Sequence, residues 1–509
     1  MKKQIAINSF TNVSVHFVRM VIALFMTPFL LSRLGKEVYG ILPLVNSLVA
    51  FLVLASGGIQ GAVGRYATFY LSKENNETAN RFINTAFFLL AGIMGLMLLP
   101  FLVCVFFLPV LLNLPAGHEF EAQLVFFILG INLLIGILFS PLTIGLYFKQ
   151  RFDVKNGITV IGQLFYLALV IAAFHFFRPN IVYVSLSMLV NTVVTNVFFI
   201  WTSVKLVPSI RISFTLFDRE KLKEIAGFSF WVIIIQATTL IFLNTDYIII
   251  NKFLGSASVT NYSLPARFNE MLRNIITAAI TVVTPLCTQL EAKGAFDTIR
   301  MIFERGQRIV LFIVIPASFL LCIFSRELLV TWVGSEFAHL SMLFWVVLLP
   351  QILILAAMPC NVILGGMGKV KVVGIVNSIS AVLNIGLSIL FVWGLNYGIM
   401  GVALATSLVL SLKNFLFLPV YTSHVIKAPY MNYYNAFFRP LMAAVPMVAL
   451  AFYLHSSFDI IGWFELLYTS GICTAVFCIA AYVLAFDDSD KEDLKTFLHR
   501  SLFYSTARR

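Results

Sequence analysis

Long apolar runs alternate along the chain with short polar connections, and this pattern predicts membrane-spanning helices. A helix needs about 20 mostly apolar residues to cross the hydrocarbon core of a bilayer, and fourteen segments meet that requirement. These predicted spans are residues 8–31, 38–60, 82–108, 122–147, 157–177, 181–204, 226–251, 259–288, 304–324, 338–364, 371–393, 398–421, 437–454 and 462–486. We therefore expect an all-α polytopic membrane protein with fourteen transmembrane helices.

Basic residues gather in every second connection, which fixes the expected orientation. With the N-terminus in the cytoplasm, 26 of the 35 Lys and Arg residues fall on the inside, 5 fall on the outside and 4 lie within spans. Cytoplasmic connections carry an excess of Lys and Arg in membrane proteins. The sequence therefore predicts that both termini are cytoplasmic.

Two distant segments end a predicted helix in the same way, at Leu34-Gly35 and at Leu254-Gly255. The longest basic connection lies between the sixth and seventh helices, so we expect two parallel six-helix lobes followed by two additional helices. The predicted parts are an N-terminal lobe over 1–204, a cytoplasmic linker over 205–225, a C-terminal lobe over 226–421, two additional helices over 437–486 and a cytoplasmic tail over 487–509.

Composition agrees with a membrane location and excludes several classes of protein. Hydrophobic residues make up 60% of the chain and charged residues 11%, against about 45–50% and 25% in soluble domains. The net charge of +12 follows from the basic cytoplasmic connections, so we predict no nucleic-acid partner. The six Cys lack metal-ligand spacing, and no nucleotide-binding motif or catalytic triad occurs. We predict a protein that is not an enzyme and needs no cofactor or metal.

Polar residues on one face of the first predicted helix are the first candidates for a substrate site. Asn8, Asn12, His16 and Arg19 follow helical spacing and share a face. An ionisable side chain near the middle of a bilayer costs about 2.5–3.5 kcal/mol on insertion scales, so it faces a cavity or a partner. We expect Asn12, His16 and Arg19 to line a cavity; the alternative is packing against another helix, with Arg19 paired to a carboxylate.

The predicted span 259–288 carries a longer polar stripe. Arg267, Glu270 and Asn274 lie along it, with Arg273 beside them. Lipid cannot satisfy such a stripe, so it faces water or another helix. We expect Arg267, Glu270, Arg273 and Asn274 to bind substrate, whereas the Thr residues that follow equally suit helix packing. Glu270 lies one turn from both arginines, so it either tunes their binding of the substrate or simply neutralises their charge.

Three further polar residues have open roles. Asp246, near the outer end of the seventh span, either pairs with an arginine, binds a coupling cation or lies at the interface. Arg65, near the inner end of the second span, is either a gate of the cavity or a topological anchor. Lys413 in the twelfth span is near enough to the inner surface to reach water.

Several loose motifs occur along the chain. They are Asn8-Ser9-x-x-Asn12 to Pro28-x-Leu30, Arg33-Leu34-Gly35-x-x-x-Tyr39-Gly40, Gly57 to Arg65, Asn244-x-Asp246 to Leu254-Gly255, and the eighth span with Pro285. In these motifs the chain resembles the Wzx-type flippases of lipid-linked oligosaccharides. They belong to the superfamily of multidrug, oligosaccharidyl-lipid and polysaccharide exporters, with the lipid II flippases and the multidrug-and-toxin extruders.

The resemblance implies two six-helix lobes around a central cavity and transport by alternating access. It implies that Arg19 and one of Arg267 or Arg273 meet the diphosphate, while Arg65 matches a family arginine only loosely. The membrane charges are net cationic, which suits an anionic head group. The choice between Arg267 and Arg273 stays open.

The expected function is a flippase in the bacterial inner membrane. It would move an undecaprenyl-diphosphate-linked oligosaccharide from the cytoplasmic to the periplasmic leaflet. Membrane lipid, a coupling H⁺ or Na⁺ and polysaccharide polymerase machinery are further candidate partners. The alternatives are a cation-coupled drug or metabolite antiporter of the same superfamily, a lipid II flippase, and a membrane glycan polymerase or ligase, against which the short outer connections argue.

Overall fold

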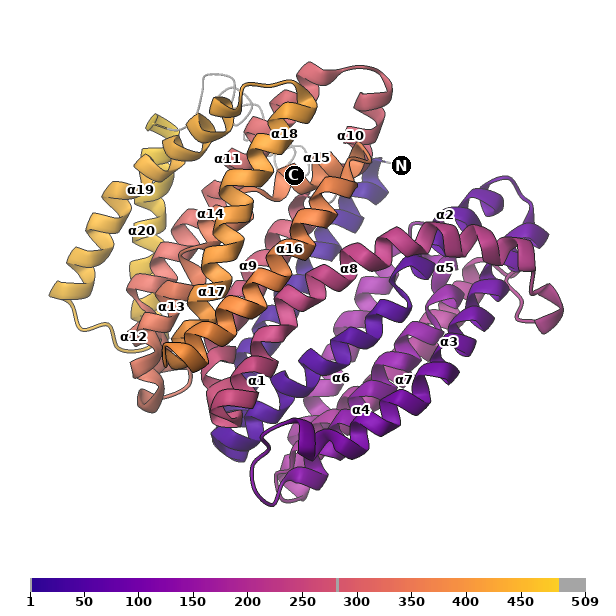
Figure 1. The fold of residues 1–509 in the computed structure, drawn as a ribbon, viewed down its shortest axis with the longest axis horizontal. Helices are drawn as coiled ribbons and strands as arrows, with labels where there is room; N and C mark the ends of the chain where they lie inside the picture. Colours follow the sequence, from indigo (N-terminus) through magenta and orange to yellow (C-terminus); the bar gives the residue numbers. More distant parts are fainter. Residues whose placement is uncertain (1, 281–282, 485–509) are drawn as a thin grey trace, which may run out of the picture. The chain divides into compact units, whose positions relative to one another are not determined.

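Apolar runs fold as helices because a helix satisfies its own backbone hydrogen bonds where lipid offers no partners. The computed structural model describes residues 2–280 and 283–484, and every regular element there is helical (Figure 1). The first eight α-helices are α1 (Lys2–Val49), α2 (Gly57–Ser72), α3 (Asn76–Leu111), α4 (Glu119–Leu138), α5 (Ile144–Phe148), α6 (Phe152–Phe176), α7 (Ile181–Leu206) and α8 (Arg219–Leu254).

The later α-helices are shorter and more often interrupted. They are α9 (Ser256–Ile280), α10 (Val283–Ala292), α11 (Phe296–Ile323), α12 (Ser325–Trp332), α13 (Ser341–Leu348), α14 (Gln351–Ala356), α15 (Met358–Gly366), α16 (Val370–Ile389), α17 (Gly398–Leu412), α18 (Leu418–Ile426), α19 (Tyr430–Ser457) and α20 (Trp463–Leu484). A short π-helix, η6 (Lys413–Phe417), joins α17 to α18. The predicted tail over 487–509 lies outside the described residues.

The contacts divide the chain into two units. The first comprises Met1–Leu264 and Gly374–Thr406, and the second comprises Pro265–Val373 and the residues from Ser407 onward. The helices α9, α16 and α17 each contribute residues to both units. The two predicted six-helix lobes stay a prediction.

Eleven helical segments in the described residues are long and apolar enough to cross a membrane. They are Phe17–Leu54, Asn76–Leu111, Glu119–Leu138, Phe152–Phe176, Ile181–Leu206, Phe296–Ile323, Ser335–Gly366, Lys371–Gly394, Gly398–Ile426, Tyr430–Ser457 and Trp463–Leu484. This confirms the all-α, multi-pass architecture. The first segment takes in most of two predicted spans, and the predicted seventh and eighth spans, on α8 and α9–α10, are not among the eleven. The number fourteen therefore stays a prediction.

Two glycines mark the helix ends that the sequence singled out as similar. Gly35 interrupts α1 with φ 77° and ψ 167°, and Gly255 ends α8 with φ 80° and ψ 175°. Glycine populates positive φ without the steric penalty that a Cβ imposes. Gly35 and Gly255, each preceded by Leu, thus share a backbone conformation, and the internal repeat stays a prediction.

The segment between α7 and α8 is held against α3 by two asparagine side chains. The Asn80 amide donates to the carbonyl of Ser209 at 2.7 Å and accepts from the Arg211 amide at 2.9 Å. Asn84 repeats the pattern, donating to the Arg211 carbonyl at 2.7 Å and accepting from the Ser213 amide at 2.8 Å. Both asparagines are buried, so these bonds satisfy polar groups of side chain and backbone together.

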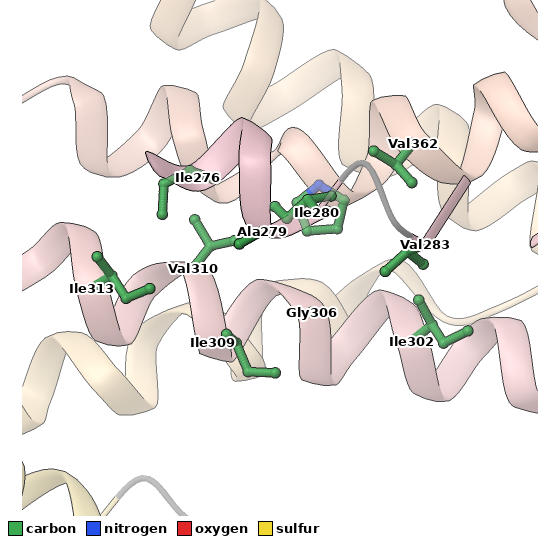
Figure 2. A pocket seen from close by; sticks show the side chains of 11 residues that line it. Ile276, Ala279, Ile280, Val283, Ile302, Gly306, Ile309, Val310, Ile313 and Val362 are labelled. Carbon is green, nitrogen blue, oxygen red and sulfur yellow. The ribbon is translucent and has the colours of Figure 1, made fainter. Parts of the chain in front are cut away.

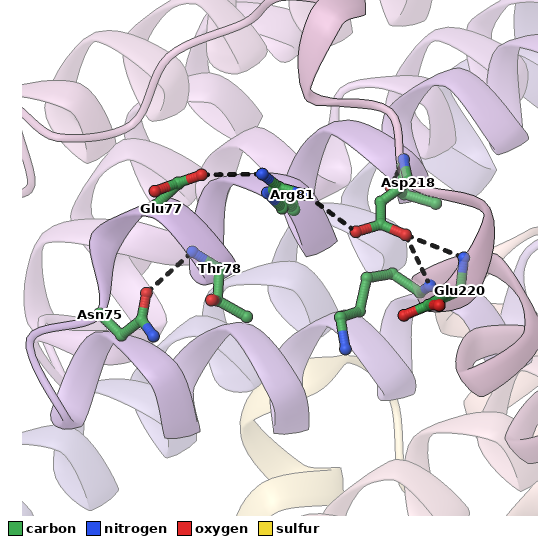
Figure 3. Close-up of polar contacts among 8 residues, drawn as sticks. Asn75, Glu77, Thr78, Arg81, Asp218 and Glu220 are labelled. Atoms are coloured by element: carbon green, nitrogen blue, oxygen red, sulfur yellow. Dashed lines mark hydrogen bonds and ion pairs between the residues drawn. The ribbon is translucent and has the colours of Figure 1, made fainter.

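The same segment ends at Asp218, which caps the start of α8. Its Oδ1 accepts from the backbone amides of Glu220 at 2.8 Å and Lys221 at 3.4 Å. Arg81 on α3 lies between two carboxylates, 2.8 Å from Glu77 and 3.3 Å from Asp218 (Figure 3). The amide of Glu220, the amide of Lys221 and the Arg81 guanidinium together lower the pKa of Asp218 below its usual value.

Loss of this cap is expected to destabilise the start of α8. Asp218→Ala lowers the midpoint of thermal unfolding at pH 7 by about 1–3 °C, and Asp218→Asn, which keeps an acceptor for the Glu220 amide, lowers it less. A carboxyl with a lowered pKa stabilises at neutral pH and loses that effect as pH falls through the lowered pKa. The gap between wild type and Asp218→Asn should therefore close in acid. This difference in melting midpoint is measured by fluorimetric melting of the purified proteins from pH 7 downward. A difference that persists in acid would contradict a stabilising role for the Asp218 charge.

The second unit is built around α11. This helix packs against α19, which in turn packs against α20 (Figure 1). Phe303 of α11 lies against Tyr433 of α19 with ring centroids 5.6 Å apart, and both side chains are buried. The two additional C-terminal helices of the sequence prediction thus stabilise the helix that faces α9 and α10.

Candidate functional site

The charged residues of α9 lie in the second unit and form a row along the helix. A guanidinium nitrogen of Arg267 lies 3.7 Å from a carboxylate oxygen of Glu270, and the two side chains are 40% and 62% exposed. An exposed ion pair of this length is weak, because water screens it. The pair with Glu270 therefore contributes little to the stability of α9.

Arg273 lies one turn further along α9 and is half-buried. Glu270 attracts it, and the ammonium of Lys413 lies near enough to repel it. Lys413 is the first residue of the π-helix η6, and π-helical segments within α-helices occur frequently at functional sites. Two cations are thus held near each other in the same unit, with Asn274 exposed beside them on α9.

This cluster, Arg267, Glu270, Arg273 and Lys413, carries a net charge of +2 by formal count. Like charges held together at low dielectric repel each other, and an anion that binds between them relieves the repulsion. Arginine binds phosphate oxygens through two parallel N–H donors, and lysine adds a point charge. The cluster is suited to a phosphate or diphosphate group.

The first unit holds a second pair of cations. Arg19 on α1 has an exposed side chain, and its charge acts on Lys155 of α6. The two helices also meet where the Asn156 amide donates to the Thr11 hydroxyl at 3.1 Å. The positive charge predicted at Arg19 is therefore reinforced by a residue from another helix.

Three of the predicted site residues have side chains outside the described part of the structure. They are Asn12 and His16 on α1 and Arg65 on α2. Their backbones are helical, as predicted. Their roles in a cavity or a gate stay predictions.

Asp246 on α8 lies in a buried network of the first unit. Its side chain is 3% exposed, and the Tyr262 hydroxyl donates to Oδ2 at 2.7 Å. The Thr406 hydroxyl lies 3.0 Å from both carboxylate oxygens and 3.0 Å from Oδ1 of Asn384. Ser388 lies 3.4 Å from the same Asn384 oxygen. Residues from α8, α9, α16 and α17 thus meet at one carboxylate.

The donors around the Asp246 carboxylate are neutral side chains, namely the Tyr262 and Thr406 hydroxyls and the Asn384 amide. Thr406 has one hydroxyl proton and three oxygens at 3.0 Å, and among the described residues no Lys or Arg forms an ion pair with Asp246. Burial of an uncompensated carboxylate is costly. Carboxylate, amide and hydroxyl oxygens are also the ligands that hard cations prefer. The arrangement therefore suits a proton or a small monovalent cation.

Sequence reasoning missed several residues of these sites. The sequence places Lys155 in an inside connection and predicts that Lys413 reaches water. It predicts no site role for Tyr262, Asn384 or Thr406, although the last two are polar residues within apolar predicted spans, which is the available signal. Their meeting with Asp246 depends on contacts across up to 160 residues of sequence.

A family model described as polysaccharide biosynthesis protein matches residues 30–342. The chain is 23% identical over 477 residues to a Bacillus subtilis (strain 168) protein named uncharacterized membrane protein EpsK, covering 94% of each chain. It is also 23% identical over 279 residues to a Salmonella typhi protein provisionally named as an O-antigen transporter, covering 52% of this chain and 60% of that protein.

Solved structures of transporters share the fold. The inward closed conformation of the lipid II flippase MurJ aligns with a TM-score of 0.70 at 15% identity, covering 93% of this chain and 98% of that one. An inward-facing multidrug resistance MATE family transporter of the MOP superfamily aligns with a TM-score of 0.66 at 16% identity, covering 82% of this chain and 99% of that one. The predicted MurJ- and MATE-like fold is therefore confirmed.

Proposed function

Because this chain belongs to the polysaccharide biosynthesis protein family, we propose that it is a flippase for an oligosaccharide linked to undecaprenyl diphosphate. It moves this lipid from the cytoplasmic to the periplasmic leaflet of a bacterial inner membrane by alternating access. The observation that carries the proposal is the net positive cluster of Arg267, Glu270, Arg273 and Lys413.

The sign of this cluster favours a diphosphate over a cationic drug. A diphosphate offers several oxygens to guanidinium and ammonium donors, whereas an organic cation would meet repulsion from Arg273 and Lys413. A lipid II flippase would use the same chemistry, since its substrate also carries a diphosphate. The two functions differ in the glycan that the transported lipid diphosphate carries.

Asp246 supplies the coupling step of the proposal. Its carboxylate takes up H⁺ or Na⁺ in one state of the transport cycle and releases it in another. A ligand drives a conformational change only by its differential affinity for the two states. The hydroxyls of Tyr262 and Thr406 provide the oxygens that hold the cation, and transport depends on the cation gradient.

The proposed membrane topology places both termini in the cytoplasm. Partners of the protein are then the lipid-linked substrate, membrane lipid and the machinery that polymerises the translocated units on the periplasmic side. The basic inside connections support this orientation.

The test is complementation in strains that lack a polysaccharide flippase. A panel of such strains, each making a different lipid-linked glycan, receives the chain at matched membrane expression, and surface polysaccharide is measured by immunoblot. We expect one or a few glycan types to be restored to at least half of the normal amount. A strain depleted of its lipid II flippase is tested in parallel.

Each result of this experiment has a definite meaning. Rescue of growth in the lipid II strain without restored polysaccharide moves the substrate to lipid II. Raised resistance to cationic dyes without restored polysaccharide supports the antiporter and contradicts the proposal. Restored polysaccharide with unchanged dye resistance supports the flippase.

A further inference from the structure

An apolar pocket lies in the second unit between α9, α10, α11 and α15. Eleven residues line it, all of them Ile, Val, Ala, Gly or Pro. Figure 2 shows Ile276, Ala279 and Ile280 of α9 on one side and Ile302 and Ile309 of α11 on the other. No charged side chain lines it, so water gains little by entering.

The pocket is small and open at one edge. Its volume is about 100 Å³, and the Ile309 side chain at its edge is 62% exposed. An apolar cavity of about 150 Å³ accepts benzene and stays free of water. The pocket therefore has room for a hydrocarbon branch of about five carbons that enters from the exposed edge.

The pocket continues the cation cluster along α9. Ile276 follows Arg273 by three residues and Ile280 follows it by seven, so all three share a helix face. The rise of about 1.5 Å per residue puts them within about 5–11 Å along the axis. On α15, Met358 lies 4.0 Å from the Thr277 hydroxyl, and its neighbour Pro359 lines the pocket. A phosphate-binding end and a hydrocarbon-binding end thus adjoin on one helix.

We propose that this pocket binds the first isoprene units of the substrate's polyprenyl chain while Arg273 and Lys413 hold its diphosphate. The inference rests on the proposed function and adds a tail site to it. The occupant is a polyprenyl diphosphate because the net charge of +2 at the cluster complements a diphosphate better than the single phosphate of an ordinary phospholipid.

Gly306 of α11 gives the sharpest way to fill the pocket. A Cβ at this position meets only Cβ and Cγ of Pro359, both at 3.5 Å, which is ordinary contact. Gly306→Ala is therefore tolerated and leaves most of the pocket open, whereas Gly306→Leu extends into it. Ile309→Thr is a second variant: its side chain is already exposed, so folding is preserved while the apolar contact is weakened.

The test measures dissociation constants of the purified full-length protein for undecaprenyl diphosphate, for saturated-chain phosphatidic acid and for inorganic pyrophosphate. Gly306→Leu should weaken undecaprenyl diphosphate binding about tenfold and Ile309→Thr about threefold, since each buried methylene contributes several-fold. Gly306→Ala should stay within about twofold of wild type. Pyrophosphate binding should be unchanged in all three variants.

The outcomes separate the tail site from the proposed function. If wild type binds undecaprenyl diphosphate and both Gly306→Leu and Ile309→Thr bind it equally well, the tail site is wrong and the flippase proposal stands. If phosphatidic acid binding falls as much, the pocket takes any hydrocarbon chain and the polyprenyl assignment is overturned. If wild type does not bind undecaprenyl diphosphate, the proposed function itself fails. Where Gly306→Leu does not purify as a folded protein, Ile309→Thr decides.

Discussion

Replacement of Arg273 by glutamine is expected to lower the rate of substrate transport about 10- to 100-fold, because hydrogen bonds to charged groups contribute about 1.5–3 kcal/mol each. Arg273 is half-buried beside Lys413, so its charge is less screened by water than that of Arg267, which is 40% exposed and already paired with Glu270. Arg267→Gln should therefore have a smaller effect than Arg273→Gln.

Reconstituted vesicles loaded with a fluorescent lipid-linked oligosaccharide measure this effect as the initial rate of translocation. Arg273→Lys should give an intermediate rate, since it keeps the charge and loses the planar pair of donors. The matched control is Arg326→Gln, because Arg326 lies in the same unit on α12 with an exposed side chain outside the cluster. Wild-type transport by Arg273→Gln, at equal reconstitution, would remove the cluster from the mechanism.

Much of the fold follows from the sequence because the bilayer restricts what apolar segments can form. Runs of about 20 apolar residues must be helical, and the structure has helices over every predicted span within its described residues. The exact division into spans is harder. Gly35 has a non-helical backbone conformation and kinks α1 between the predicted spans 8–31 and 38–60, whereas the apolar segment Phe17–Leu54 runs across that kink.

The polar connection over 205–225 shows a second limit of sequence reasoning. Its basic residues predicted a cytoplasmic linker, yet Asn80 and Asn84 fix its backbone against α3 through four hydrogen bonds. No residue pattern within the linker predicts that it packs against α3. The contacts come from two buried asparagines on α3, whose partners are about 130 residues away in the sequence.

The candidate sites divide in the same way. Arg267, Glu270 and Arg273 share one helix, so spacing alone predicts that they act together. Lys413 reaches Arg273 from another helix, and Thr406 reaches Asp246 from 160 residues away. Periodicity contains no information on such contacts. A polar residue inside an apolar span indicates that a partner exists, but only the packing of helices says which partner it is.

Asp246 is the residue whose neutral replacement should most completely separate binding from transport. Its carboxylate is buried among the hydroxyls of Tyr262 and Thr406 and the amide of Asn384. Asp246→Asn keeps the size of the side chain and an acceptor for the Tyr262 hydroxyl. It removes only the negative charge that a cation neutralises. Because the side chain keeps its size and the cation cluster lies in the other unit, the fold and that cluster should be preserved.

We expect Asp246→Asn to lower gradient-driven transport about 100-fold, the effect of about 2.7 kcal/mol lost from coupling, while the dissociation constant for undecaprenyl diphosphate stays within about twofold. Tyr262→Phe, which loses one hydrogen bond, should cost about two- to tenfold. Transport into vesicles is measured with Na⁺ and pH gradients imposed separately, and the gradient that accelerates wild type identifies the cation. Asp297→Asn is the control, because that carboxylate is 95% exposed. If Asp246→Asn keeps the wild-type response to that gradient, Asp246 does not bind the coupling cation, and its buried network serves helix packing alone.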